Sequence, residues 1–197
     1  MSFAERRRFL WILFLIGLAL IAVAARATTL TRLSFDELAA RADSVVRARC
    51  LSTSSGWESG EIWTFSEFEV LDAPKGLVGR LIMVRGLGGR VDGFVSSVEA
   101  VPRFSPGEEV YLFLFPARSN AASARGPSYH VLGWSQGAFR IHRDARTSRA
   151  TITQDSAALA VFDRCTHAFR RDGLRNVPLD NFEQRLRATL ARAQEQE

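Results

Sequence analysis

A succession of short β-type segments, separated by glycine- and proline-containing turns, most constrains the fold of this chain. Between Val45 and His142 the apolar residues either alternate with polar ones or form short continuous runs. Alternation is typical of half-buried strands, and a short apolar run is typical of fully buried ones. We expect strands at residues 45–52, 62–71, 81–85 and 110–115. The last segment is apolar on both faces, which predicts a central strand covered on both sides.

The intervening residues are of the types that favour turns and loops. We expect a polar loop at residues 52–60 and an Ala/Ser-rich loop at residues 117–128. The glycines of residues 86–93 predict a bulge or a sharp bend. They do not form a phosphate-binding loop, because the Lys-Ser/Thr ending and the following helix are missing from the sequence pattern.

The pattern of residues 129–142 predicts a β-hairpin. Ser135-Gln136-Gly137 fits a three-residue loop with Gly137 in the left-handed conformation. This register places His130 opposite His142.

Short helices are expected on either side of the strands. Ser34 and Glu37 form a capping box, which predicts a helix that ends near Asp43. From about residue 155, a first C-terminal helix is predicted by apolar residues at helical spacing, namely Ala158, Phe162, Cys165 and Phe169.

A second C-terminal helix is predicted after Pro178, with Asp180 and Glu183 as its capping pair. Its apolar stripe consists of Phe182, Leu186 and Leu190. The expected fold class is therefore mainly β, a small and mostly antiparallel barrel with one short N-terminal helix and two C-terminal helices.

The first 27 residues have the pattern of a secretory signal peptide. Arg6-Arg7-Arg8 precedes a 16-residue apolar run from Leu10 to Ala25, and Ala25-Arg26-Ala27 is an A-x-A cleavage signature. A helix of that length covers about 24 Å, whereas a membrane span needs roughly 20 residues. We therefore expect a cleaved signal peptide and a periplasmic or secreted protein. An uncleaved anchor at residues 10–25 is the alternative.

The mature chain is expected to be only weakly basic. Removing residues 1–27 takes away four arginines and one glutamate, which lowers the formal net charge from +5 to +2. A nucleic-acid partner thereby loses its electrostatic support. Residues 28–197 suit a single domain with its own core.

Three segments in the first part of the mature chain resemble the tissue-inhibitor-of-metalloproteinase and netrin modules. Residues 42–48 (Ala-Asp-Ser-Val-Val-Arg-Ala) are similar to the first strand of these modules. Phe68-Glu69-Val70-Leu71 leads to Lys75-Gly76 as in their second strand. Residues 106–113 (Pro-Gly-Glu-Glu-Val-Tyr-Leu-Phe) are similar to their G-x-x-Y-L-x-F strand. The resemblance covers roughly residues 40–115 and implies an OB-type barrel. The chain also resembles short exported bacterial proteins of unassigned function.

The same family implies an inhibitory mechanism that this sequence does not support. Its inhibitors bind the protease zinc through an N-terminal cysteine and are held together by several disulfides. Here the expected mature start is Thr28-Thr29-Leu30, and the chain has two cysteines. Metalloprotease inhibition by that mechanism is therefore not expected.

Gly133-Trp134-Ser135-Gln136-Gly137 matches the G-x-S-x-G pattern of serine hydrolases. That motif requires a strained serine between a strand and a helix, whereas the residues after Gly137 have a strand pattern. We expect a turn that contains a serine. A hydrolase that uses Ser135 is the less favoured alternative.

A metal site is not expected. His130 and His142 would supply half of a zinc site across the predicted hairpin, but zinc needs at least a third protein ligand. His167 lies on a distant predicted helix, and Arg140 and Arg143 would repel a cation. No cofactor motif is present in the sequence.

The tryptophans are the best candidates for contact with a partner. Trp57 lies in the predicted polar loop, where an aromatic ring has no evident core to fill, and exposed aromatic residues often anchor interfaces. Trp63 and Trp134 are further candidates. The alternative for each is that it packs at a barrel end or beneath a helix.

Cys50 and Cys165 are candidates for one disulfide in an oxidising compartment. Strand parity places Cys50 toward the interior, and helical spacing places Cys165 on an apolar helix face. Two separately buried thiols are the alternative. The sequence as a whole favours an exported, non-enzymatic binding domain with a protein or other envelope partner. A membrane-anchored envelope protein is the alternative.

Overall fold

The computed structural model describes residues 30–117, 128–147 and 149–195. The expected signal peptide and residues 118–127 of the expected Ala/Ser loop lie outside the described residues. Within the described ranges, no helix is both long enough and apolar enough to cross a membrane.

Three antiparallel strands form one side of the main sheet. They are β1 (Ser44–Glu58), β2 (Glu61–Lys75) and β3 (Leu81–Leu87), and β2 pairs with both neighbours. The sequence predicted all three, but β1 continues through most of the expected polar loop. Only Ser59 and Gly60 separate β1 from β2, with φ values of 52° and 82°, which is the backbone of a tight hairpin turn.

The other strands of the main sheet are β6 (Glu109–Pro116), β7 (Ser128–Val131), β8 (Ala138–Arg143), β9 (Ala150–Gln154) and β12 (Val177–Pro178). β6 pairs antiparallel with β1, β7 and β8. β7 pairs parallel with β3. β9 pairs antiparallel with β8 on one side and with β12 on the other.

The predicted hairpin at residues 129–142 is wrong. β7 and β8 do not pair with each other. They follow one another along β6, with Leu114 opposite Val131 and Leu112 opposite Ala138. A short 3-10 helix, Trp134–Gly137, takes up the extra residues between them. Both strands share a partner that precedes them in the chain, and the local alternation of residues 129–142 contains no information about that partner.

β6 lies between two hydrophobic clusters, as its apolar faces predicted. Val110, Leu112 and Leu114 face the cluster formed with β1, β2, β3 and β7. Tyr111 and Phe113 point the other way, into a cluster covered by helices. All five side chains are at most 2% exposed. Because successive residues of a strand point to opposite faces, this single strand contributes to both halves of the core.

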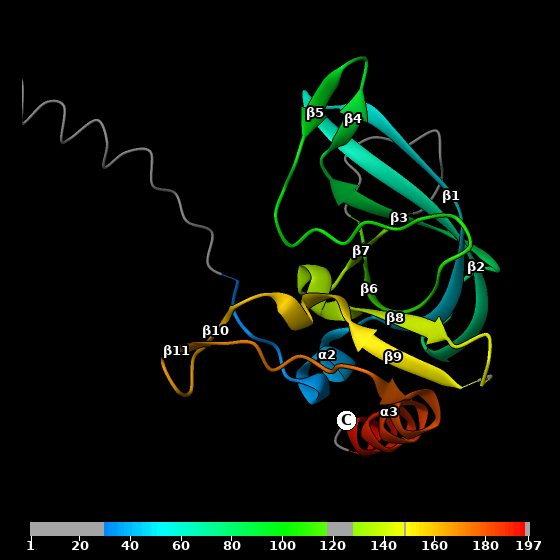
Figure 1. The fold of residues 1–197 in the computed structure, drawn as a ribbon, viewed down its shortest axis with the longest axis vertical. Coiled ribbons are helices and arrows are strands. Elements are labelled where there is room, and N and C mark those ends of the chain that lie inside the picture. The colour runs from blue at the N-terminus through cyan, green and yellow to red at the C-terminus, as the bar shows by residue number, and fades with distance from the viewer. Residues whose placement is uncertain (1–29, 118–127, 148, 196–197) are drawn as a thin grey trace, which may run out of the picture. The chain divides into compact units, whose positions relative to one another are not determined.

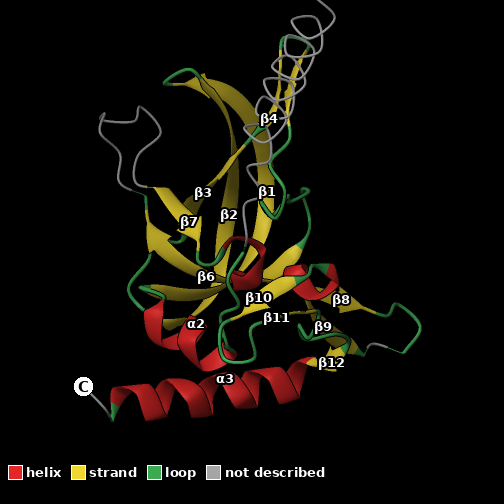
Figure 2. Ribbon diagram, turned by 90° about the vertical axis from the view of Figure 1, so that its left-hand side faces the viewer, coloured by secondary structure: helices red, strands yellow, loops and turns green. Residues whose placement is uncertain are grey.

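Two α-helices cover the second cluster (Figure 2). In α2 (Phe35–Arg41) the Ser34–Glu37 capping box is present, which confirms the prediction. In α3 (Leu179–Gln194) the stripe of Phe182, Leu186 and Leu190 is buried as predicted. The predicted Asp180–Glu183 capping pair is wrong. Pro178 begins the helix without a side-chain cap.

The chain's only lysine fixes the end of α2. The Lys75 ammonium group, at the end of β2, donates hydrogen bonds to the carbonyl oxygens of Ala39 (2.9 Å) and Ala40 (3.0 Å). A cation at this position satisfies carbonyl groups that have no partner within the helix and complements the helix dipole. The next residue, Gly76, has a φ of 79° and lies against Ser44, so a side chain would not fit there.

The predicted first C-terminal helix is also wrong. A short 3-10 helix, Asp155–Ala158, is followed by a separate hairpin of β10 (Val161–Asp163) and β11 (Ala168–Arg170). The Asp163 carboxylate accepts hydrogen bonds from the backbone amides of Cys165 (2.8 Å) and Thr166 (3.2 Å). These bonds stabilise a turn at this point, in competition with a helix.

A second small hairpin, β4 (Gly89–Val91) with β5 (Phe94–Ser96), lies beside the far end of the β1–β2 hairpin (Figure 1). The bend that the glycines predicted is present between β3 and β4. Gly88 has a φ of 88°, and the backbone of Gly89 packs directly against Ser55 and Thr64. This bend brings β4 and β5 onto the tip of the long hairpin.

Candidate functional site

The tip of the β1–β2 hairpin carries exposed apolar side chains on the side of β4 and β5. Trp57 is 52% exposed, Phe94 is 63% exposed and Val95 is 62% exposed. The rings of Trp57 and Phe94 meet edge to face, with their centroids 5.9 Å apart. We call Trp57 and Phe94 the apolar tip. Val95 follows Phe94 in β5 and therefore points to the opposite face of that small hairpin. The predicted contact residue Trp57 thus lies against a second exposed ring.

Trp134 belongs to a different element. It lies in the 3-10 helix between β7 and β8, is 40% exposed, and has a φ of 61°. This 3-10 helix is not part of the β1–β2 or β4–β5 hairpin, so Trp134 is not part of the apolar tip.

The opposite face of the same hairpin carries a second group of rings, which we call the aromatic–arginine row. Its members lie side by side across four strands: Trp63 and Phe65 on β2, Arg85 on β3, His130 on β7 and Phe115 on β6. Phe65 is directly opposite Arg85, and His130 is directly opposite Phe115. Trp63 pairs with Gly56, next to the Trp57–Ile62 pair. Because adjacent positions face opposite ways, Trp63 and Trp57 point to different sides.

The members of this row are in direct contact. The guanidinium carbon of Arg85 lies 4.0 Å from the ring centre of Trp63 and 5.7 Å from that of Phe65. The ring of His130 lies 5.9 Å from that of Trp63 and 5.3 Å from that of Phe115, centre to centre. The rings of Trp63, His130 and Phe115 are half-buried, so each keeps an accessible part.

The charge of Arg85 is compensated within this group. Its two terminal nitrogens donate to the two carboxylate oxygens of Glu58 at 3.1 and 2.9 Å. The arginine side chain is only 7% exposed, and that of Glu58 is 34% exposed. A buried guanidinium without such a partner would carry a large desolvation cost. The row therefore presents rings and polar groups without a free positive charge on Arg85.

His130 is held toward its neutral form. Burial lowers its pKa, and the nearby positive charge of Arg85 lowers it further, against a hydrogen bond to the Arg85 backbone that raises it. At neutral pH the imidazole is then both a hydrogen-bond donor and an acceptor.

Only part of this row was predicted from the sequence. Trp63 was named as a candidate for partner contact. His130 was considered only as a metal ligand, and Phe65, Arg85 and Phe115 were not considered. An outward-facing aromatic residue on each of several strands is a detectable signal, since the exposed positions of an antiparallel sheet are usually polar. Which strands lie next to each other was the missing information, because β7 and β6 reach this face only through the observed pairing.

The G-x-S-x-G segment lacks the geometry of a nucleophile elbow. Ser135 is 3% exposed, and its residue lies in the 3-10 helix that precedes strand β8 instead of an α-helix. Its hydroxyl has no hydrogen-bond partner in the described part of the chain. The following Gln136 supports the fold: its side chain accepts from the Leu33 amide (2.7 Å) and donates to the Thr31 carbonyl (2.9 Å).

The three histidines are on separate parts of the fold. His130 belongs to the aromatic–arginine row, His142 is exposed opposite Thr151 on β9, and His167 lies in the β10–β11 turn. The predicted juxtaposition of His130 and His142 is wrong, since their strands are not paired. The described ranges contain no group of three or more His, Cys, Asp or Glu residues arranged to hold a metal ion.

The two cysteines are free thiols in the structure. Cys50 points into the hydrophobic cluster formed with β1, β2, β3, β6 and β7, as strand parity predicted, and it is 1% exposed. Cys165 is exposed in the β10–β11 turn and not on a helix face. The candidate disulfide was argued from a helix that the structure does not contain.

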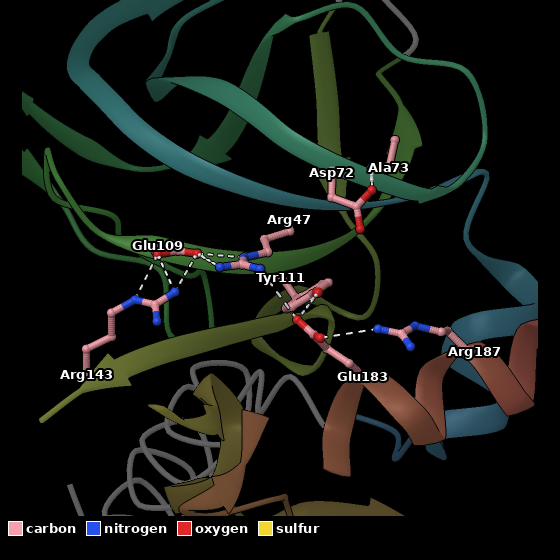
Figure 3. A network of polar contacts seen from close by, with 8 residues as sticks. All are labelled: Arg47, Asp72, Ala73, Glu109, Tyr111, Arg143, Glu183 and Arg187. Carbon is pink, nitrogen blue, oxygen red and sulfur yellow. Dashed lines mark hydrogen bonds and ion pairs between the residues drawn. The ribbon is translucent and has the colours of Figure 1, made fainter. Parts of the chain in front are cut away.

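A network of charged groups ties α3 to the sheet (Figure 3). The Tyr111 hydroxyl donates to the Glu183 carboxylate at 2.9 Å. Arg47 lies between Glu109 (2.5 Å) and Glu183 (3.5 Å), and Arg143 also contacts Glu109 at 3.2 Å. Burial raises the pKa of Tyr111, and its bond to Glu183 raises it further. This network is satisfied internally, so we assign it to the docking of α3.

A hollow of about 250 Å³ lies between the start of α2, α3 and the 3-10 helix Asp155–Ala158. Arg32 and Asp172 on its wall form an ion pair at 3.1 Å. The glutamines that line it, Gln136 and Gln154, hold backbone groups of neighbouring segments. Its polar groups thus serve contacts within the chain.

A scan against protein-family models finds no family that matches this sequence, and a search of the curated proteins finds no match.

Proposed function

We propose that this chain is an exported, non-enzymatic binding domain on an OB-type barrel and that it contacts a partner protein of the cell envelope through the apolar tip. The export part rests on the N-terminal pattern of residues 1–27. An anchored form that keeps the apolar segment is the alternative, and the mass of the purified native protein separates the two.

The strand pairing supports the OB-type barrel. β1 pairs with β2, β2 with β3, β3 with β7, β7 with β6, and β6 returns to β1. An OB-type Greek-key barrel has five strands, and the cyclic order with one parallel pair supports this proposal. The resemblance of residues 40–115 to the tissue-inhibitor-of-metalloproteinase and netrin modules is in line with it.

The observation that carries the proposed function is the contact between two exposed aromatic rings at one place. Trp57 and Phe94 are each more than half exposed at the ends of two adjoining hairpins. Water contact with such a group is unfavourable, and clustered exposed aromatics are typical interface anchors. The backbone below them is fixed, because β4 packs against the tip through Gly89. An anchor held in this way loses little conformational freedom on binding.

Site-specific photo-crosslinking in intact cells tests this proposal. A photoreactive phenylalanine analogue replaces Phe94 in one variant and Phe169 in a control variant. Phe169 is 62% exposed on the β10–β11 hairpin, which matches the 63% of Phe94. We expect a discrete crosslinked partner from position 94 that is missing from position 169 and is lost when Trp57→Ser is added. Equal crosslinking from both positions, or none from position 94, would contradict the proposal.

A further inference from the structure

We propose that the aromatic–arginine row is a binding site for a neutral oligosaccharide. This site is independent of the apolar tip, since Trp63 and Trp57 point to opposite faces of the β1–β2 hairpin. It extends across β2, β3, β7 and β6.

The ring geometry suits a sugar. A pyranose presents C–H groups on its faces and hydroxyls around its edge, so it packs on an aromatic ring while its edge forms hydrogen bonds. Trp63, His130 and Phe115 provide consecutive half-buried rings, 5.3 to 5.9 Å apart between neighbours. The ring of His130 is tilted by 55° to that of Trp63 and by 31° to that of Phe115, so the three rings form an uneven apolar strip on which a sugar face can pack.

Polar groups for the hydroxyls lie at one end of the row. The Glu58 carboxylate is 34% exposed and is fixed by its two bonds from Arg85. A carboxylate held in this way can accept hydrogen bonds from sugar hydroxyls without first losing its orientation. His130 is a second polar group, in the middle of the row.

The charge pattern favours a neutral ligand over a polyanion. Binding to nucleic acid depends on free arginine or lysine side chains along a groove, with aromatic rings as a stacking platform. Here the rings are present, but the one arginine among them is already paired with Glu58. A polyanion would also have to approach the Glu58 carboxylate, which repels it. A neutral glycan meets neither obstacle.

Isothermal titration calorimetry of residues 28–197 with three neutral probes, cellohexaose, maltohexaose and hexa-N-acetylchitohexaose, tests the proposal. We expect at least one hexasaccharide to bind with a Kd of about 1 mM or tighter. Trp63→Ala should weaken this binding by about tenfold or more. The control is Trp57→Ala, which removes a tryptophan from the other face of the same hairpin and should change the affinity by less than about twofold.

Two further measurements keep the outcome clear. If Trp63→Ala does not fold by circular dichroism, Phe115→Leu replaces it, because leucine keeps apolar volume but removes the ring. Polygalacturonate and a thymidine 15-mer serve as the anionic probes. The proposal fails if none of the three hexasaccharides binds, if the anionic probes bind more tightly, or if the variant of the row binds as well as Trp57→Ala.

Discussion

The guanidinium carbon of Arg85 lies 4.0 Å from the ring centre of Trp63, and the same guanidinium is held end-on by the Glu58 carboxylate. The indole covers one face of the cation, and the carboxylate bonds its two terminal nitrogens, while Nε is buried without a hydrogen-bond partner among the described residues. An arginine on the outer face of a sheet is usually solvated, but this one is only 7% exposed. The pairing with Glu58 is therefore a condition for the packing of the whole row.

Glu58→Gln is expected to lower the free energy of unfolding by about 1–3 kcal/mol, because it leaves a buried guanidinium without its counter-charge. The control is Glu61→Gln, across the tight turn at an exposed position, which should cost less than about 0.5 kcal/mol. Urea unfolding followed by circular dichroism measures both. Equal losses in the two variants would mean that the Arg85–Glu58 pair contributes no more than a surface charge.

His130 should make the stability depend on pH. Its pKa in the folded protein is lowered by burial and by Arg85, so the unfolded chain, with an ordinary value of about 6.5, takes up the proton first. Stability is then fully present above that ordinary value and is lost as the pH falls from it toward the lower folded pKa. His130→Gln should reduce the change in urea midpoint between about pH 7.5 and about pH 5.

The exposed His142 provides the matched control for that titration. His142→Gln is the same substitution at an exposed position opposite Thr151, so comparison with it separates the effect of burial at His130 from the effect of the substitution itself. An NMR titration of the imidazole protons gives a direct check, and a His130 signal that titrates at or above the ordinary value would refute the assignment.

Two partners of Glu183 in the network of Figure 3 should contribute unequally to stability. Tyr111→Phe keeps the buried ring and removes only the hydrogen bond to Glu183, so we expect a loss of about 1 kcal/mol. Arg187→Ala removes an ion pair whose arginine is 76% exposed, and such a pair contributes about 0.5 kcal/mol or less. Thermal and urea unfolding compare the two variants, and a larger loss for Arg187→Ala would contradict this account of the network.

Predictions from the sequence were correct where residues of a single helix or strand contain the necessary information. The Ser34–Glu37 capping box is a local signal, since its two residues lie three apart. The continuous apolar run of β6 predicted burial on both faces, and its residues do enter both clusters. The stripe of Phe182, Leu186 and Leu190 likewise follows from one helix facing one core.

Sequence reasoning failed where one pattern fits two structures, or where the structure depends on contacts between distant segments. Phe162 and Phe169 are seven residues apart, which fits a helix face, but they pair directly across the β10–β11 hairpin. The turn chemistry of Asp163 decides between the two. The aromatic–arginine row could not be derived either, because it depends on β7 lying parallel to β3, a contact between residues far apart in the chain.

Gly137 should be intolerant of substitution for a reason other than the one predicted. It lies outside the left-handed region, and Gly133 (φ 64°) and Trp134 (φ 61°) adopt that conformation instead. An added Cβ at Gly137 would clash with the Leu132 carbonyl oxygen. Gly137→Ala is therefore expected to cost about 1–3 kcal/mol.

Gly79→Ala provides the contrast within the same type of substitution. Its Cβ would meet only the Leu81 carbonyl oxygen, at 3.4 Å, and its φ lies outside the left-handed region. Alanine there restricts the unfolded chain without strain, so the variant should be neutral or more stable by up to about 1 kcal/mol. Urea midpoints that fall equally in both variants would show that the contact at Gly137 does not cause the loss.

The two cysteines should differ in reactivity, and this difference also tests the disulfide that the sequence suggested. Cys165 is exposed, whereas Cys50 is buried, and burial together with the Glu108 charge raises the pKa of its thiol. A thiol reacts readily only when it is deprotonated and accessible to the reagent. Without reductant, the native protein should therefore show one fast thiol with Ellman's reagent, and Cys165→Ser should abolish it. The second thiol should appear only after denaturation. A denatured, unreduced sample with no free thiol would instead demonstrate a Cys50–Cys165 bridge, and the β10–β11 turn would then have to lie against the end of β1.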